Sequence, residues 1–292
     1  MSENINHRQI HWFPGHMAKT LRVMEQSVRQ VDVVLELLDA RIPHSSLNPE
    51  VERIAQARPR LYVLNKADLA DPEITKRWVA YFKRQGSGCV AISSKQRGGM
   101  EGVKKAIDQE LAELLARRAD KGTAGAAIRI MVTGIPNVGK STFINSFIGA
   151  SRALAADKPG VTRGKQWISA GGYDLLDMPG VLWKKFESDI VASNLAFIGS
   201  IRDDILDVEA LATHLLEQLQ KTAAPQLRER YKLDEEVLEL DAYDLLDVMG
   251  RNRGMLMSGG VVNMERAAVA FVDEFRASKL GRISLERPEG VQ

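Results

Sequence analysis

Short apolar runs alternate with longer amphipathic segments through the first part of the chain. The apolar runs predict buried strands at 33–38 (VVLELL), 61–64 (LYVL), 89–92 (CVAI) and 128–133 (IRIMVT), and a hairpin at 166–169 and 173–176. Helical periodicity predicts helices at 72–85, at 100–118 and through FINSFI (143–148). Strands that alternate with helices are typical of an α/β fold with a mostly parallel sheet.

The pattern changes after about residue 187, because helical periodicity alone then continues to about residue 280. One predicted helix, 261–275, places Val261, Ala268, Val272 and Phe275 on one face, which we interpret as core or domain packing. Pro225 predicts a break between two helical blocks.

These patterns divide the chain into an N-terminal arm (1–30), an α/β domain (31–186) and a smaller all-helical C-terminal domain (187–292). Within the α/β domain, the small, Gly-containing stretch ADKGTAGAA (119–127) is interpreted as a linker.

Composition narrows the class of protein. The 292 residues are 45% hydrophobic and 27% charged, which is ordinary for a soluble globular protein. No apolar run approaches the roughly 18 residues of a membrane helix, and the N-terminus has no signal-peptide core. The lone Cys89 fits a reducing compartment. We therefore expect a cytoplasmic monomer without a membrane partner. The net charge of +2 permits a nucleic-acid partner without demanding one.

A phosphate-binding loop follows the strand at 128–133. The stretch Gly134-Ile-Pro-Asn-Val-Gly-Lys-Ser141 matches G-x-x-x-x-G-K-[ST] between a strand and a helix. Its N–H groups would face phosphate oxygens, the Lys140 ammonium would reach the β and γ phosphates, and the Ser141 hydroxyl would bind Mg²⁺. The residues expected to contact the nucleotide here are Asn137, Val138, Gly139, Lys140, Ser141 and Thr142. The alternative is a glycine turn without a ligand.

A guanine reader ends the strand at 61–64. In Asn65-Lys66-Ala67-Asp68, the Asp68 carboxylate can accept from guanine N1–H and the 2-amino group, a donor pair that adenine lacks. Asn65 can bridge to loop backbone and base, and the Lys66 stem can cover the base face. Ser93 and Ser94, after the next strand, could offer backbone N–H to guanine O6. The alternatives are a solvated strand-to-loop junction and an ordinary polar turn.

A Mg²⁺ site beside the phosphate loop is expected to use a D-x-x-G motif. This pattern occurs at 157–160, 177–180 and 247–250. Only Asp177 ends an apolar strand, so we expect Asp177 to hold the Mg²⁺ through water and the Gly180 N–H to sense the γ-phosphate. Thr162 is the second candidate Mg²⁺ hydroxyl, with a plain surface threonine as the alternative. Val181 stands where small GTPases carry a water-orienting Gln, so another group must position the water, or hydrolysis is very slow.

The base reader precedes the phosphate loop, which inverts the usual order. If 128–180 is placed before 30–118, the sheet of a GTPase is complete, and 119–127 joins the old ends. Such a circular permutation is tolerable because termini often lie close together. The sensor then leads directly into the helical domain, a plausible two-state switch.

Six motifs of the chain together resemble those of one known family. WFPGHMAK (12–19), DARIP (39–43), NKAD, GIPNVGKST, DMPG and LMSGG (256–260) together resemble the circularly permuted P-loop GTPases, including bacterial factors for late assembly of the large ribosomal subunit. The resemblance covers nearly the whole chain. It implies GTP hydrolysis, slow alone and stimulated by the immature large subunit, with Mg²⁺ as cofactor and often K⁺ activation. It also implies rRNA docking by the C-terminal helices.

Two residues take roles from this resemblance. His16 in FPGHM corresponds to the family's proposed catalytic histidine, and the permutation independently places the arm near the sensor. The alternative is a histidine that packs the arm or touches RNA. Asn137 lies where K⁺-activated relatives place a cation ligand, and a loop-stabilising amide is the alternative.

Basic residues surround the predicted switch region and recur near the C-terminus: Arg152, Lys158, Arg163, Lys165, Lys184 and Lys185, then Arg251, Arg253, Lys279 and Arg282. Both groups suit RNA phosphates, although a charge run is usually a solvated face. Two rival functions stay open: a GTP-dependent RNA-binding or ribosome-binding module whose hydrolysis is incidental, and an ATP-using kinase or transporter ATPase, against which NKAD argues.

Overall fold

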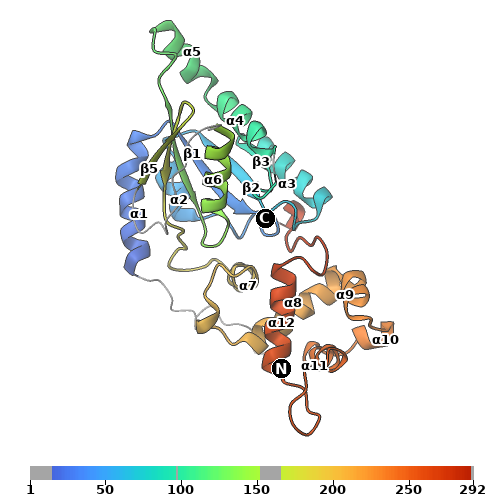
Figure 1. Cartoon of the computed structure of the whole chain (residues 1–292). Coiled ribbons are helices and arrows are strands. Elements are labelled where there is room, and N and C mark those ends of the chain that lie inside the picture. The colour runs from blue at the N-terminus through green and yellow to red at the C-terminus, as the bar shows by residue number, and fades with distance from the viewer. Residues whose placement is uncertain (1–14, 97, 152–165, 291–292) are drawn as a thin grey trace. The chain divides into compact units, whose positions relative to one another are not determined.

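The computed structural model describes residues 15–96, 98–151 and 166–290, with the backbone alone at His16, Ala150 and Ser151 (Figure 1). The described residues fall into two compact units. One unit runs to Lys185 and includes the tail from Glu286 onward. The other is Phe186–Leu285.

A six-stranded sheet forms the first unit, with strand order β3-β2-β1-β4-β6-β5. The strands are β1 (Val33–Asp39), β2 (Arg60–Asn65), β3 (Gly88–Ala91), β4 (Ile128–Gly134), β5 (Gln166–Ala170) and β6 (Tyr173–Asp177). All neighbours pair in parallel except β5 and β6. The predicted fold class is confirmed, and β1, between β2 and β4, joins the two segments that the permutation separates.

Helices cover the sheet, and they explain why the central strands are mostly apolar. The first unit holds α1 (Gly15–Ser27), η1 (Val28–Gln30), α2 (Pro49–Ala55), α3 (Pro72–Arg84), α4 (Gly99–Glu110), α5 (Ala112–Asp120) and α6 (Lys140–Ser151). All seven residues of β1 are buried, as expected for a strand covered on both faces. The Asp71 carboxylate caps α3 by accepting from Glu73 N–H and Ile74 N–H.

One predicted helix is two helices. The periodicity over 100–118 merges α4 and α5, which meet at Leu111. Leu111 is buried and has φ −102° and ψ 14°, outside the regular helical geometry, whereas α5 buries none of its residues. Packing of Leu111 therefore ends α4 at a point that the hydrophobic pattern does not mark.

The predicted hairpin of β5 and β6 is present. Ala170 pairs with Tyr173, and the two residues between them, Gly171 and Gly172, have φ of 55° and 87°. Two consecutive positive φ angles are what a tight two-residue hairpin turn requires, and glycine adopts them without strain.

The second unit is helical, as predicted. It contains α7 (Asp189–Phe197), η2 (Asp203–Ile205), α8 (Val208–Thr222), α9 (Ala224–Tyr231), α10 (Glu235–Leu238), α11 (Ala242–Asn252) and α12 (Met264–Arg276). α8, α11 and α12 pack against one another. Pro225 stands in the first turn of α9, directly after α8 ends, which confirms the predicted break. Among the described helices, none combines the length and apolar character that a bilayer crossing requires.

The helix predicted over 261–275 begins later than expected. Asn263 caps α12 by accepting from Arg266 N–H, and Val261 lies before the helix with 59% of its surface exposed. A bridge between Leu256 and Val262 closes a turn that contains Gly259 and Gly260, both at positive φ. The buried face of α12 is Ala267, Ala268, Phe271, Val272 and Phe275, so Val261 was wrongly assigned to it.

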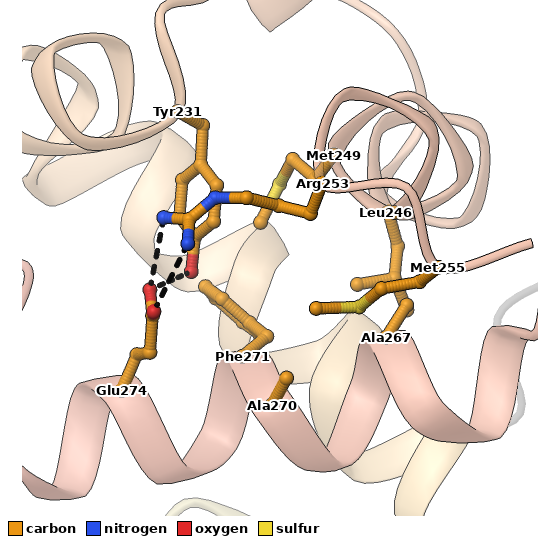
Figure 2. A pocket seen from close by; sticks show the side chains of 10 residues that line it. Tyr231, Leu246, Met249, Arg253, Met255, Ala267, Ala270, Phe271 and Glu274 are labelled. Carbon is orange, nitrogen blue, oxygen red and sulfur yellow. Dashed lines mark hydrogen bonds and ion pairs between the residues drawn. The ribbon is translucent and has the colours of Figure 1, made fainter.

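A charged cluster borders the core of this unit (Figure 2). Glu274 of α12 accepts from the Tyr231 hydroxyl at 2.9 Å and from Arg253, which also lies over the Tyr231 ring. Arg230 donates to the same carboxylate at 2.9 Å. Burial, followed by the Glu274 charge, holds the pKa of Tyr231 well above its usual range. The hydroxyl therefore stays protonated and donates to Glu274.

The chain's last described residues return to the first unit. η3 (Pro288–Gly290) contacts α3, and the Glu286 carboxylate accepts from His44 N–H at 2.7 Å and from the hydroxyl of Ser45. The Trp78 indole N–H donates to the Glu286 carbonyl oxygen at 3.2 Å. The tail thus fastens the loop after β1 to α3.

Candidate nucleotide-binding site

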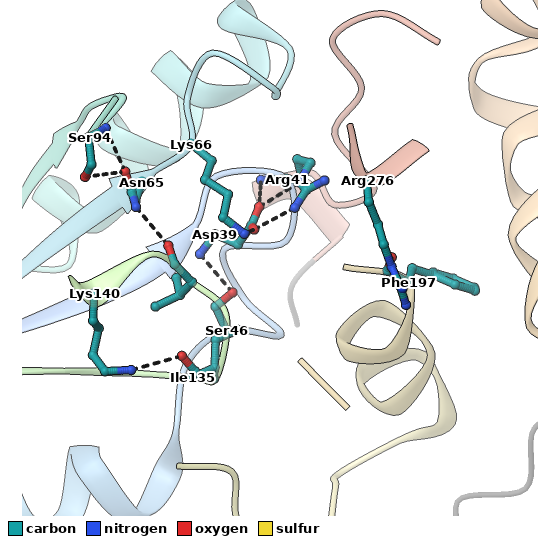
Figure 3. A network of polar contacts seen from close by, with 11 residues as sticks. Asp39, Arg41, Ser46, Asn65, Lys66, Ser94, Ile135, Lys140, Phe197 and Arg276 are labelled. Atoms are coloured by element: carbon teal, nitrogen blue, oxygen red, sulfur yellow. Dashed lines mark hydrogen bonds and ion pairs between the residues drawn. The ribbon is translucent and has the colours of Figure 1, made fainter. Parts of the chain in front are cut away.

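Three loops meet at the carboxyl ends of the parallel strands, the edge where α/β sheets bind ligands. Asn65, at the end of β2, is buried and donates its amide to the carbonyl oxygen of Val138 at 2.8 Å. Its amide oxygen accepts from Ser94 N–H at 3.1 Å and the Ser94 hydroxyl at 2.8 Å (Figure 3). One side chain therefore joins the NKAD loop, the loop after β3 and the phosphate loop.

The phosphate loop bends where its sequence predicts. Gly134 has φ 149°, and a Cβ there would lie 2.5 Å from the Leu37 carbonyl oxygen. Gly139 has φ 98°, and a Cβ there would lie 2.5 Å from the Asn65 amide nitrogen. Asn137 also adopts a left-handed backbone, with φ 58°. Only glycine fits the two close approaches, so the loop's shape depends on them.

The helix after the loop begins at Lys140, with Ser141 and Thr142 exposed in its first turn. The Lys140 ammonium donates to the carbonyl oxygens of Ile135 at 3.4 Å and Gly134 at 3.5 Å. Burial lowers the pKa of Lys140 to about 8, although the Asp177 charge opposes that shift. These long contacts leave the ammonium weakly held, and it lies where the backbone N–H groups of a helix start favour an anion.

The DMPG segment lies directly against the phosphate loop. Met178 N–H donates to the Val132 carbonyl oxygen at 3.2 Å, and Val181 N–H to that of Gly134 at 3.3 Å. A Cβ on Gly180 would lie 2.9 Å from both the Lys140 ammonium and the Pro136 Cα. Glycine is therefore needed at 180 for contact between sensor and loop.

Val181 is fully buried and offers no polar side-chain group to a water molecule. Its carbonyl oxygen accepts from the Asn48 amide at 3.1 Å. Asn48 also caps α2. The loop after β1 thus holds the residue that follows the sensor, a contact for which the sequence carried no motif.

The base-reading loop (residues 65–68) is fixed by contacts with the end of β1 and the loop after β3. Lys66 has φ 58°, and its ammonium contacts the Asp39 carboxylate at 2.9 Å. Ala67 N–H donates to the Ile92 carbonyl oxygen at 3.0 Å. The half-buried Asp68 carboxylate accepts no hydrogen bond from any residue that the structure describes. It is the loop's available acceptor.

The loop after β3 is tied down as well. The sequence predicted that the Ser94 N–H could donate to guanine O6. In the structure this N–H donates to the amide oxygen of Asn65. The Ser94 carbonyl oxygen accepts from the Ser146 hydroxyl of α6 at 2.6 Å. The buried Ser93 hydroxyl has no hydrogen-bond partner among the described residues.

Other predicted site residues are placed less completely. Thr162 lies outside the described residues, as do Arg152, Lys158, Arg163 and Lys165. The backbone of His16 belongs to the first turn of α1. Lys184 and Lys185 are exposed, and so are Arg251, Arg253, Lys279 and Arg282.

The chemistry of Ser141 and Asp177 shows whether they could hold a metal ion. Within the described part of the chain, no group of three or more His, Cys, Asp or Glu residues could hold a metal alone. Ser141 presents an exposed hydroxyl, and the buried Asp177 carboxylate interacts electrostatically with the neighbouring Lys140. Hydroxyl and carboxylate oxygens, completed by phosphates and water, are what Mg²⁺ prefers, so these residues fit the ion.

Comparisons with known proteins agree with this geometry. A family model described as "50S ribosome-binding GTPase" matches residues 129–246, from β4 onward. Ribosome biogenesis GTPase A of Bacillus cereus is 43% identical over 281 residues, which cover 96% of this chain and 94% of that protein. The protein of the same name from Thermotoga maritima is 31% identical, over 96% of this chain and 95% of that one.

Solved structures are also similar. A GDP-bound structure of TM YlqF superposes with a TM-score of 0.68 at 28% identity, covering 92% of this chain and 100% of that one. A GNP-bound YlqF from T. maritima gives a TM-score of 0.64 at 27% identity, covering 94% and 100%. The similarity extends over both compact units.

Proposed function

The chain belongs to the ribosome biogenesis GTPase A family of circularly permuted P-loop GTPases, and from this premise we propose that it binds the immature large ribosomal subunit and couples GTP hydrolysis to late assembly of that subunit. The observation that carries the nucleotide site is the Asn65 amide, which bonds the base-reading loop to the phosphate loop. A single nucleotide needs both loops at one edge of the sheet.

In this proposal the base lies at the NKAD loop and the phosphates at the start of α6. Asp68 accepts from guanine N1–H and the 2-amino group, and the Lys66 stem covers the base face. Lys140 and the N–H groups of residues 137–142 bind the phosphates, with the Gly180 N–H facing the γ-phosphate. Ser141 binds Mg²⁺ directly, and Asp177 binds it through water. The ion would neutralise charge on the β and γ phosphates.

The hydrolytic step needs a group that orients water, because Val181 has none. We assign that role to His16, whose backbone begins α1, and the second Mg²⁺ hydroxyl to Thr162. Asn137 is the candidate K⁺ ligand, since its exposed side chain extends from a left-handed position in the phosphate loop.

Ribosomal RNA is the proposed partner. The exposed Lys184 and Lys185 follow the sensor directly, and the helical unit has exposed basic residues of its own at Arg251, Arg253, Lys279 and Arg282. Because the sensor leads into the helical unit, the nucleotide state can be transmitted to RNA contacts.

The deciding experiment measures GTP turnover with and without immature large subunits, in K⁺ and in Na⁺ buffers. We expect slow turnover alone, strong stimulation by subunits, and more activity in K⁺. His16→Ala should bind subunits but lose the stimulation, whereas the control His214→Ala, on α8, should behave like the parent protein.

Two outcomes would overturn the proposal. ATP that displaces labelled GDP as well as GTP does would end the guanine assignment. Full subunit maturation by His16→Ala would favour the rival module in which hydrolysis is incidental.

A further inference from the structure

The DARIP stretch at the end of β1 forms a buried charge cluster beneath the base-reading loop (Figure 3). The Asp39 carboxylate is fully buried. It accepts from the Arg41 guanidinium at 2.9 Å and 2.8 Å, one bond to each oxygen, and from the Lys66 ammonium at 2.9 Å. A carboxylate buried between two cations is stable only with such geometry, so all three side chains are held in place.

The backbone joins the same two segments. Asp39 lies opposite Asn65 in the parallel register of β1 and β2, and Ala40 N–H donates to the Asn65 carbonyl oxygen at 2.9 Å. Lys66, the next residue, has φ 58°, an uncommon backbone for a residue with a side chain. Its bond to Asp39 fixes the direction in which the stem leaves this unusual position.

Electrostatics agrees with the geometry of the cluster. Burial would lower the pKa of Arg41, but Asp39 and, less strongly, Asp68 raise it. Burial would raise the pKa of Asp39, yet Arg41 and Lys66 hold it well below its usual range. The cluster is therefore one buried anion between two cations. Asp68 lies outside it and accepts no hydrogen bond from a described residue, which leaves its oxygens for a ligand.

We propose that Asp39 and Arg41 are positioning residues for purine binding: Arg41 holds the Asp39 carboxylate, and Asp39 sets the Lys66 stem against the base face. This inference rests on the proposed GTP function and adds residues outside the NKAD motif. It predicts a loss of affinity without a loss of guanine preference, since the base face is common to all purines, whereas the edge distinguishes guanine.

The test measures displacement of a fluorescent GDP by GDP, by inosine diphosphate, which lacks the 2-amino group, and by xanthosine diphosphate. Asp39→Asn and Lys66→Met should weaken GDP and inosine diphosphate equally, by about tenfold. The double variant should be no weaker than the weaker single variant, because Asp39 acts through Lys66. Arg41→Gln should also weaken both nucleotides equally and keep the preference for GDP over inosine diphosphate, because Arg41 holds Asp39 and does not contact the base edge.

Controls separate failure of this inference from failure of the proposed function. Glu36→Gln removes another buried carboxylate from β1, and it should leave every affinity unchanged. Asp68→Asn should shift preference to xanthosine diphosphate, because its amide can donate to the 2-carbonyl. Absence of that shift, or parent protein that does not prefer GDP to ADP, would overturn the GTP function itself.

The inference alone is overturned if additive losses appear in the double variant, or if Asp39→Asn or Arg41→Gln loses the parent preference for GDP. Should Asp39→Asn fail to fold, Lys66→Met and Arg41→Gln still decide, since each leaves Asp39 one cationic partner. Circular dichroism of each variant confirms that folded protein is compared.

Discussion

The base-reading loop and the phosphate loop share one edge of the sheet but hold their cations differently. Lys66 is fixed by the buried Asp39 carboxylate at 2.9 Å, whereas Lys140, among the residues that the structure describes, donates to backbone carbonyl oxygens at 3.4 Å and 3.5 Å. The protein's own charges organise the base side before any ligand binds. The phosphate side leaves the Lys140 ammonium with long contacts only, and in the proposed function this charge serves the nucleotide phosphates.

The largest expected effect comes from removing that reserved charge. Lys140→Met should weaken GTP binding by about a hundredfold, because hydrogen bonds to charged groups contribute about 1.5–3 kcal/mol. The fold should be unharmed, since an apolar side chain of similar length replaces a weakly held ammonium. Calorimetric titration with GTP and a thermal melt check both. A melt several degrees lower would show that Lys140 is part of the fold.

Breaking the link between the loops should have the next largest effect. Asn65→Ala leaves the Val138 carbonyl oxygen and the Ser94 hydroxyl without their partner. We expect a loss of about 2–4 kcal/mol in unfolding free energy and at least a tenfold weaker GDP affinity. Denaturant unfolding and GDP titration measure these. Asn145→Ala, an exposed asparagine on α6, is the control and should change neither.

A smaller and more selective effect is expected at the sensor. Gly180→Ala would place a methyl group 2.9 Å from the Lys140 ammonium and the Pro136 Cα. Overpacking of this kind typically costs about 1–3 kcal/mol, so GTP hydrolysis should fall about tenfold while GDP affinity stays near the parent value. Gly149→Ala, with open space around the added carbon, should leave both unchanged. Equal loss of GDP binding would mean that Gly180 shapes the whole loop.

Sequence reasoning succeeded where the determinants are local. β1, β2 and β4 follow from apolar runs, the β5–β6 hairpin was expected at 166–169 and 173–176, and the permuted strand order follows from the order of the motifs. The meeting of the NKAD and phosphate loops was also predictable, because carboxyl ends of parallel strands share an edge.

What the sequence did not reveal depends on tertiary contacts. Leu111 ends a helix by packing, and Val261 leaves a helix face because a turn forms before Asn263. The Asp39–Lys66 ion pair and the Asn48 bond to Val181 join residues whose spacing carries no periodicity. For the charge cluster around Asp39, the DARIP stretch at the end of a strand was the one available indication, since a carboxylate and a guanidinium two residues apart can share a site.

The smallest expected effect on nucleotide affinity comes from a buried carboxylate in the middle of β1, Glu36. Burial raises the pKa of Glu36 from 4.5 to about 7, opposed by the Asn48 N–H and by Arg60, and assisted by Glu52. Because the folded-state pKa is raised, this group's contribution to stability is complete below pH 4.5 and is lost as the pH rises through 7. The shift corresponds to about 3 kcal/mol.

Glu36→Gln should therefore be more stable than the parent protein at pH 8 and nearly equal to it at pH 4.5, as measured by urea unfolding across that range. Its GDP affinity should be unchanged. Parallel pH profiles in the two proteins would show instead that Glu36 is ionised in the folded state, and a change in GDP affinity would show that both loops draw on charges deeper in β1 than Asp39.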